Sequence, residues 1–194
     1  MAFRNTPMDR RYSVATSPPP VQQTSIHDRQ LQDWFKAVDS DGNGKLTTEE
    51  LQNALLNDNM SQFNLETVRL MMNMFDRDQS GYIDIYEFVG LWRYIEKWRA
   101  CFRNFDRDGS GSIDAGELKH ALRTFGYNIG DRLIHTVILK YDRHGKGDIT
   151  FDSFIQVCVT IHSLTSSFRN FDTDSDGWVY INYEQFLELV ISNK

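Results

Sequence analysis

One pattern recurs along this chain and constrains its fold more than any other feature does. Segments that begin at Asp39, Asp76, Asp106 and Asp172 carry oxygen-bearing side chains at alternate positions, a Gly at position 6 and an apolar residue at position 8. The first three of them end with a Glu at position 12. Oxygens that alternate around a tight turn can surround a hard cation such as calcium, which takes six to eight of them at roughly 2.3–2.6 Å. The pattern therefore predicts loops that bind calcium.

The three complete loops match the EF-hand motif, in which positions 1, 3, 5 and 12 donate side-chain oxygens and position 7 donates its backbone carbonyl. The expected ligands are Asp39, Asp41, Asn43, Lys45 and Glu50 in the loop 39–50, Asp76, Asp78, Ser80, Tyr82 and Glu87 in the loop 76–87, and Asp106, Asp108, Ser110, Ser112 and Glu117 in the loop 106–117. At position 9, Thr47 is expected to act through a water. We expect two to three strong Ca²⁺ sites, with Mg²⁺ as a competitor.

A degenerate copy of the loop occupies residues 142–153. It places His144 and Lys146 at ligand positions and Ser153 at the closing position, while it keeps the glycine and the apolar residue of the turn. A cation at a ligand position repels calcium. We therefore expect this copy to keep the fold of a hand without binding an ion.

The last copy, at residues 172–183, is incomplete in a different way. It lacks a Glu at position 12, where Tyr183 stands. Three carboxylates and one carbonyl remain as ligands, so we expect a weak site here. Its expected ligands are Asp172, Asp174, Asp176 and Trp178.

The spacing of the loops predicts how the hands are connected. Successive loops start 37, 30, 36 and 30 residues apart. Each short step leaves only 88–105 or 154–171, which is room for one helix of about 27 Å, so that helix must leave one hand and enter the next. The longer steps leave 51–75 and 118–141, enough for two helices and a turn. The prediction is an all-α fold of five helix-loop-helix units.

The apolar residues at position 8 predict how the hands pair. Two such residues from neighbouring loops form a short two-stranded link, which is marginal without a partner. Hands one and two can pair, as can three and four, which leaves the fifth hand for a second chain in a two-fold dimer. The alternative is that its residues pack against their own core. The expected dimer residues are Trp178, Val179, Tyr180 and Tyr183.

Composition narrows the class of protein. With 194 residues and 40% hydrophobic content, the chain can bury one sizeable core, which we place at 28–194. Residues 1–27 contain three consecutive prolines and many Ser and Thr, so we predict a flexible tail. No apolar run approaches a membrane span, no signal-like segment begins the chain, and Cys101 and Cys158 lie in apolar helical patterns. We expect a cytoplasmic protein with two buried, reduced thiols.

Charge and motifs exclude other functions. There is no basic stripe for nucleic acid, no nucleophile motif and no glycine-rich phosphate loop, so we expect no enzymatic activity. The formal net charge is −6. Three calcium ions would add 3 × 2 = 6 positive charges, and the loss of self-repulsion would favour association with partners or a membrane surface.

Five hands with this alternation resemble the penta-EF-hand family over residues 30–194. The likeness rests on Phe-Asp-Arg-Asp at 105–108, Phe-Gly-Tyr at 125–127, Phe-Ile-Gln-Val-Cys at 154–158, Asp-Thr-Asp-Ser-Asp-Gly-Trp at 172–178 and Tyr-Glu-Gln at 183–185. The resemblance implies dimerisation through the fifth hand, with a like or a related chain. It also implies pockets that calcium opens for proline-rich segments of membrane-trafficking proteins. The positions matched to those pockets are Leu55, Phe88, Trp92, Ile95, Phe151 and Tyr183.

Three functions follow as expectations. The first is a calcium sensor and calcium-dependent adaptor that is recruited to endomembranes or the plasma membrane at sites of trafficking or repair. The second is a calcium buffer with no effector surface, and the third is a regulatory subunit of a calpain-like enzyme. Two departures from the family bear on the choice: the second loop is complete here, and the tail lacks glycine-rich repeats.

Overall fold

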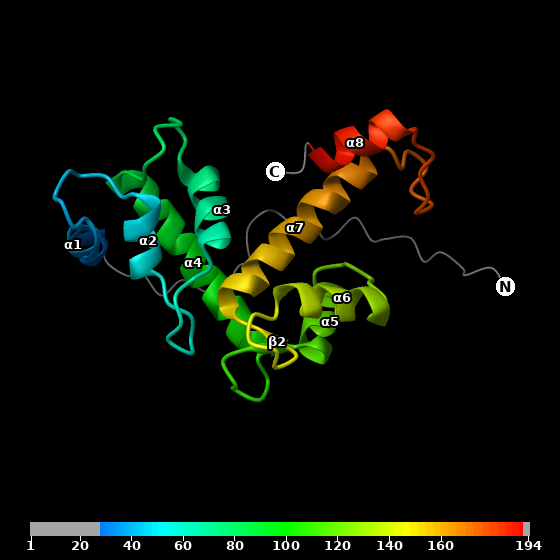
Figure 1. Cartoon of the computed structure of the whole chain (residues 1–194), viewed down its shortest axis with the longest axis horizontal. Helices are drawn as coiled ribbons and strands as arrows, with labels where there is room; N and C mark the ends of the chain where they lie inside the picture. The colour runs from blue at the N-terminus through cyan, green and yellow to red at the C-terminus, as the bar shows by residue number, and fades with distance from the viewer. Residues whose placement is uncertain (1–27, 192–194) are drawn as a thin grey trace.

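The computed structural model describes residues 28–191, which form eight helices and one two-stranded sheet (Figure 1). The predicted tail at 1–27 lies outside the described residues, as do residues 192–194. The helices are α1 (Asp28–Val38), α2 (Thr48–Ala54), α3 (Leu65–Phe75), α4 (Ile85–Phe105), α5 (Ala115–Thr124), α6 (Asp131–Tyr141), α7 (Phe151–Arg169) and α8 (Tyr183–Ile191), and the strands are β1 (Ile113–Asp114) and β2 (Asp148–Ile149).

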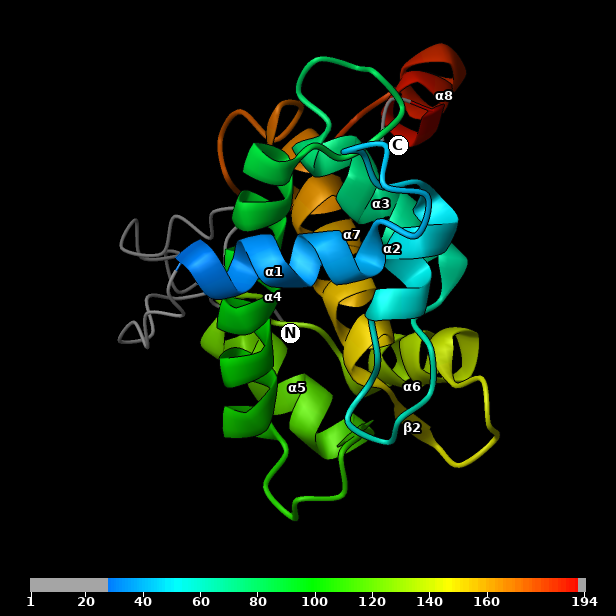
Figure 2. The same ribbon diagram turned by 90° about the vertical axis from the view of Figure 1, so that its left-hand side faces the viewer.

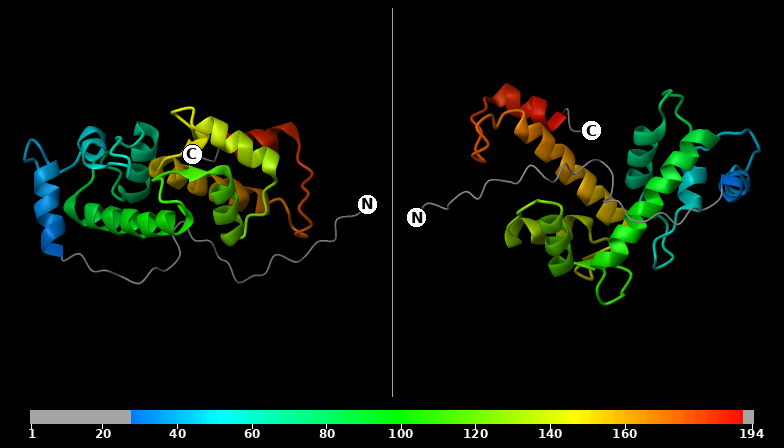
Figure 3. Two further views of the ribbon diagram at one scale, coloured as in Figure 1. Left: turned by 90° about the horizontal axis from the view of Figure 1, so that it is seen from below. Right: turned by 180° about the vertical axis from the view of Figure 1, so that it is seen from behind.

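Two long helices connect the hands, as the short steps between loops predict. Helix α4 has 21 residues and α7 has 19. Helix α4 leaves the second loop and enters the third, while α7 leaves the fourth loop and runs toward the fifth (Figure 3). Both helices are shared between two hands, which confirms the predicted connection.

The position 8 residues link the loops in pairs. Leu46 and Ile83 form an antiparallel bridge, in which each backbone N–H donates to the other residue's carbonyl at 2.9 and 3.0 Å. In the second pair, Ile113 of β1 lies opposite Ile149 of β2. Within the described part of the chain, Val179 of the fifth loop belongs to no strand or bridge. Hands one to four are therefore paired as predicted, and the fifth is left over.

The core lies where α4 and α7 meet. Phe102 of α4 packs edge-on against Phe151 and Phe154 of α7, with ring centroids 5.4 and 5.6 Å apart. The side chains of Cys101 and Cys158 are buried and unpaired nearby in the same core, as expected. Burial of large aromatic side chains supplies most of the favourable free energy in such a core.

The first and the last helix differ in how far they are buried. Helix α1 lies across α4 and buries Leu31 and Phe35 (Figure 2). Helix α8 packs against α7 and has no buried residue. None of the helices in residues 28–191 is long and apolar enough to cross a membrane.

Candidate metal centres

Acidic side chains converge in four of the five loops. In each group, carboxylate oxygens from three residues lie within 4.8 Å of one another. Like charges this close repel unless a cation lies between them, so the geometry fits a bound divalent ion. The groups are Asp39, Asp41 and Glu50; Asp76, Asp78 and Glu87; Asp106, Asp108 and Glu117; and Asp172, Asp174 and Asp176.

The first Asp of each loop holds the turn in shape. In the first loop, Asp39 Oδ1 accepts a hydrogen bond from the Asn43 N–H at 3.1 Å, and its Oδ2 accepts one from the Gly44 N–H at 2.8 Å. Gly44 has a φ of 77°, a left-handed conformation that glycine adopts without strain. The same pair of bonds recurs at Asp106 with distances of 3.0 and 3.0 Å. The backbone therefore turns tightly around the first ligand.

The closing Glu spans the loop. Glu50 accepts hydrogen bonds from the Ser40 N–H at 2.9 Å and the Thr47 N–H at 3.0 Å, which lie at positions 2 and 9. These donors, the Thr47 N–H first, lower the pKa of the Glu50 carboxyl, because they favour its ionised form. Both oxygens of an ionised Glu are then available to a bound calcium. Glu87 and Glu117 repeat this arrangement in their loops.

Positions 5 and 7 lie side by side. The Ser110 hydroxyl donates to the Ser112 carbonyl oxygen at 3.1 Å, and Ser80 makes the matching contact with the Tyr82 carbonyl at 3.3 Å. The hydroxyl of Ser110 also lowers the pKa of the Asp108 carboxyl. The structure thus gathers the oxygens that the EF-hand motif assigns to calcium.

Position 9 has a structural role. Asp84 and Asp114 accept hydrogen bonds from the first turn of the exit helix, and Asp114 Oδ1 lies 2.8 Å from the Glu117 N. Thr47 caps α2 in the same way. In each of the first three loops the closing Glu completes a capping box. The same residue therefore caps the exit helix and closes the loop.

The ligands of the first loop suffice for calcium. One oxygen each from Asp39, Asp41, Asn43 and the Lys45 carbonyl, with two from Glu50, makes six, and a water would make seven. The Leu46 N–H, which shares a peptide with the Lys45 carbonyl, donates to the Ile83 carbonyl at 2.9 Å and so fixes the orientation of that peptide.

The fourth loop keeps the turn without the acidic cluster. Asp142 Oδ2 accepts a hydrogen bond from the Gly147 N–H at 2.7 Å, and Ile149 pairs with Ile113. An ion pair joins Arg143, at loop position 2, to the buried Asp152 at position 11. The fourth loop thus keeps the turn and the strand pairing of a hand and lacks the three-carboxylate cluster of the other four.

The fifth loop requires a correction. In the other hands the exit helix begins at loop position 10, but α8 begins at Tyr183, which is position 12. Asn182 and Gln185 exchange hydrogen bonds of 3.0 and 2.9 Å, the capping-box pattern that joins positions 9 and 12 elsewhere. The loop is therefore two residues longer than expected, and Gln185 stands where Tyr183 was placed. The Asn-x-x-Gln spacing is the sequence signal that would have found it.

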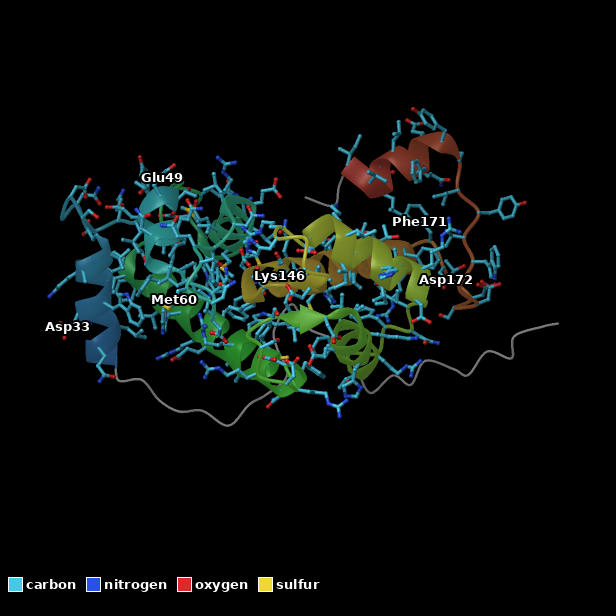
Figure 4. The ribbon with its side chains drawn as sticks, turned by 60° about the horizontal axis from the view of Figure 1, so that its bottom comes forward. Asp33, Glu49, Met60, Lys146, Phe171 and Asp172 are labelled. Atoms are coloured by element: carbon cyan, nitrogen blue, oxygen red, sulfur yellow. The ribbon has the colours of Figure 1, made fainter. Side chains whose placement is uncertain are left out.

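The residues matched to the expected partner pocket lie in separate parts of the molecule. Leu55, Phe88, Ile95 and Phe151 are core residues with at most 1% of their surface exposed. Tyr183 begins α8, at the opposite end of the molecule from α1 (Figure 1). Figure 4 shows the same separation between Asp172 of the fifth loop and Asp33 of α1. Interior packing thus closes the expected pocket in this conformation.

Comparison with known proteins agrees with the five-hand architecture. A family model described as an EF-hand domain pair matches residues 28–93 and again residues 95–191. Peflin of Danio rerio is 41% identical over 187 residues, covering 96% of this chain and 67% of that protein. Human sorcin is 39% identical over 166 residues, covering 84% of this chain and 82% of that protein.

The chain belongs to the penta-EF-hand family. A solved structure of a homologue of programmed cell death 6 protein from Leishmania major Friedlin has a TM-score of 0.74 and 29% identity, and the match covers 86% of this chain and 95% of that one. The strings quoted above resemble programmed cell death protein 6, with peflin as a related alternative, and relatives of both names match. The penta-EF-hand chain spans 62% of human peflin and 56% of Xenopus laevis peflin. No catalytic family is indicated by these matches.

Proposed function

We propose that this penta-EF-hand protein is a calcium-dependent adaptor. In this proposal loops one to three bind calcium, the fifth hand joins a second chain, and the loaded first half binds proline-rich segments of other proteins. The observation that carries the proposal is the unpaired fifth hand, which presents an apolar surface to solvent.

The fifth hand has the chemistry of an interface. The side chains of Trp178 and Tyr180 are almost wholly exposed, at 82% and 107% of their reference surface areas. Soluble proteins seldom leave several large apolar side chains together in water unless the surface binds something. The same hand of a second penta-EF-hand chain, like or related, offers the matching backbone edge at Val179. Further exposed apolar side chains on this hand are Tyr183, Phe186, Val190 and Ile191.

The first half supports calcium gating. Trp34 of α1 lies against Trp92 of α4 with ring centroids 4.1 Å apart, and Trp92 covers Phe88 of the core. Helix α1 enters hand one and α4 leaves hand two, so opening of these hands would separate the two tryptophans. An aromatic groove exposed in this way suits extended proline-rich chains, which lose little entropy on binding.

We place this activity in the cytoplasm, with recruitment to endomembranes or the plasma membrane through the bound partners. The free, buried thiols of Cys101 and Cys158 support a reducing compartment.

Dimerisation is tested by Tyr180→Glu, because this side chain is exposed and its replacement leaves the core intact. The wild type should sediment as a dimer in calcium and the variant as a monomer. Leu139→Glu, at a position on α6 that is 77% exposed, is the matched control and should remain dimeric. A monomeric wild type, or a variant that still pairs, would contradict the proposed interface.

Partner binding is tested with an immobilised peptide of consecutive prolines and aromatic residues. We expect calcium-loaded wild type to bind it, and a peptide with alanine for proline to lose binding. The double variant Glu50→Gln/Glu117→Gln should bind neither of the two peptides. Calcium uptake without binding of the peptide or of a hydrophobic dye would instead indicate a buffer. Preference for a related chain over self-pairing would indicate a regulatory subunit.

A further inference from the structure

Residues 55–64, which join α2 to α3, are called the interhand linker here. They fold into a compact hairpin of their own. The Asn57 N–H donates to the Ser61 carbonyl at 2.8 Å, and the Phe63 N–H donates to the Leu55 carbonyl at 3.1 Å. The linker reaches down from α2 and α3 toward the level of β2 (Figures 1 and 2). It is a built element with its own internal hydrogen bonds.

One side of the interhand linker is bound to hand four through Asp152. This side chain has no exposed surface, and it forms an ion pair with Arg143. Its Oδ2 accepts a hydrogen bond from the Asn64 N–H at 2.6 Å, and its own N–H donates to Asn57 Oδ1 at 3.0 Å. Asn57 is itself only 2% exposed. Hand four thus holds Asn57, where the turn of the linker begins, and Asn64, the residue that caps α3.

The other side of the interhand linker touches the third calcium loop. Asp58 forms an ion pair with Arg99 of α4, whose guanidinium also donates to the Leu56 carbonyl at 2.9 Å. Arg103 Nε lies 3.8 Å from Asp58 Oδ2. Arg103 is three residues before the third loop begins. A Cβ built on Gly111 would lie 3.6 Å from the Asp58 Cβ. Gly111 is the turn glycine of that calcium loop, so the linker is packed against it.

From these contacts we infer that the interhand linker couples calcium binding in the third loop to calcium binding in the second. An ion in the third loop fixes the turn at Gly111 and with it the surface on which Asp58 rests. The ordered linker then holds Asn64, the cap of α3, which is the entering helix of hand two. The second loop therefore has less disorder to lose when it binds its own ion, and the coupling is positive.

The inference rests on calcium binding by these two loops and is independent of the adaptor role. Helix α4 also joins the two hands directly, so part of any coupling passes along it. A change in the linker that leaves α4 intact separates the two routes. Asn57→Ala removes the bond to the Asp152 N–H and the bonds from Asn57 Nδ2 to the Ser61 hydroxyl and the Gln62 carbonyl, and it replaces no residue of α4 and no expected calcium ligand.

The coupling is measured by calcium titration calorimetry on three proteins. Glu50→Gln/Glu117→Gln leaves the second loop as the strong site, Glu50→Gln/Glu87→Gln leaves the third, and Glu50→Gln leaves both. The two-ion association constant of the last, divided by the product of the two single-loop constants, is the coupling factor. We expect a factor of roughly 5 or more, within the range of typical allosteric couplings.

Adding Asn57→Ala to all three proteins should reduce the coupling factor by at least about twofold, toward the value that helix α4 alone transmits. Asp58→Asn, at a partly exposed position, should also lower the coupling factor. It replaces Asn57→Ala in the experiment if that variant does not fold. Asp131→Asn breaks the exposed pair with Lys119 and is the control that should leave the factor unchanged. A factor near 1 in the proteins with an unchanged linker, or a factor that both linker variants leave intact, would overturn the inference.

Hydrogen exchange gives a second readout. In Glu50→Gln/Glu87→Gln, calcium in the third loop should slow amide exchange across the interhand linker as well as across residues 106–117. Asn57→Ala should remove the protection of the linker only. Protection confined to residues 106–117 in the parent protein would show that the contact at Gly111 transmits nothing.

Discussion

At the residue scale, the closing Glu residues do two things at once. Each accepts N–H groups at positions 2 and 9 and completes the cap of its exit helix. A Gln can keep the capping bond from the position 9 N–H on its one side-chain oxygen, but its NH2 group cannot accept the second bond, and it lacks the charge and the second ligand oxygen. Charge and capping can therefore be separated by experiment.

We predict that Glu117→Gln weakens calcium binding in the third loop by about a hundredfold, because a nearby unit charge contributes a few kcal/mol to ion binding. The calcium-free protein should unfold at nearly the same temperature as the wild type. Calorimetric titration and thermal melts in chelator measure the two effects. Glu66→Gln, in the first turn of α3 and outside every acidic cluster, should change neither binding nor melting.

Thiol reactivity tests the core. Burial raises the pKa of Cys101 to about 12 and raises that of Cys158 as well. Alkylation needs the thiolate, so at neutral pH both residues should react with iodoacetamide only as fast as the protein unfolds. Rapid labelling without denaturant, followed by mass spectrometry, would show that the core around α4 and α7 opens locally.

Residue spacing predicted which carboxylates converge, because each loop repeats one short pattern. The end of the fifth loop was predicted wrongly because its closing residue is a Gln that lies two residues beyond the expected position. For the pocket residues, the resemblance could not show the conformation. Resemblance names positions, whereas only packing shows that Phe88 and Phe151 are buried in this conformation.

At the element scale, helix ends depend on single residues. Helix α5 ends at Thr124, and Gly126 follows with a φ of 90° while its N–H donates to the Arg123 carbonyl at 3.0 Å. The Tyr127 N–H donates back to Leu122 at 2.8 Å. This arrangement stops the helix and turns the chain toward α6.

Gly126→Ala should destabilise the protein by about 1 kcal/mol, since an L side chain is strained in the left-handed region. Gly130→Ala is the comparison, because Gly130 caps α6 with a φ of −73° and open space around it. Its cost should be a few tenths of a kcal/mol. The midpoints of urea unfolding measure the stability of both variants. Equal losses of stability in the two variants would contradict the role given to Gly126.

Loop spacing also predicted the shared helices α4 and α7, since an 18-residue gap holds only one helix. The interhand linker could not be predicted in this way. Its decisive contacts join residues 88 and 95 positions apart, such as Asn64 and Asn57 with Asp152. Nothing in the local pattern of a degenerate loop marks Asp152 as an anchor.

At the scale of the whole molecule, charge is the property that calcium changes most. The chain carries a formal charge of −6, and three divalent ions would bring it to −6 + 6 = 0. Self-repulsion would fall, and the fifth hand could meet a second chain with less electrostatic resistance.

Calcium should therefore make wild type elute from an anion exchanger at clearly lower salt than in chelator. Each loop that cannot bind calcium should make this change in elution salt smaller, because two negative charges of the protein then stay without a compensating ion. Glu50→Gln/Glu117→Gln should shift less with calcium than wild type does. The same calcium-dependent shift in both proteins would mean that ions bind outside the predicted loops.

Helix α4 has one more consequence. Its 21 residues run without a break from the second loop to the third, a length of about 30 Å. An element this long and stiff acts as a lever: a tilt of about 10° at one end would carry the other end by about 5 Å, nearly one helical turn. A small rotation where an ion binds would thus become a large displacement on the far side of the protein.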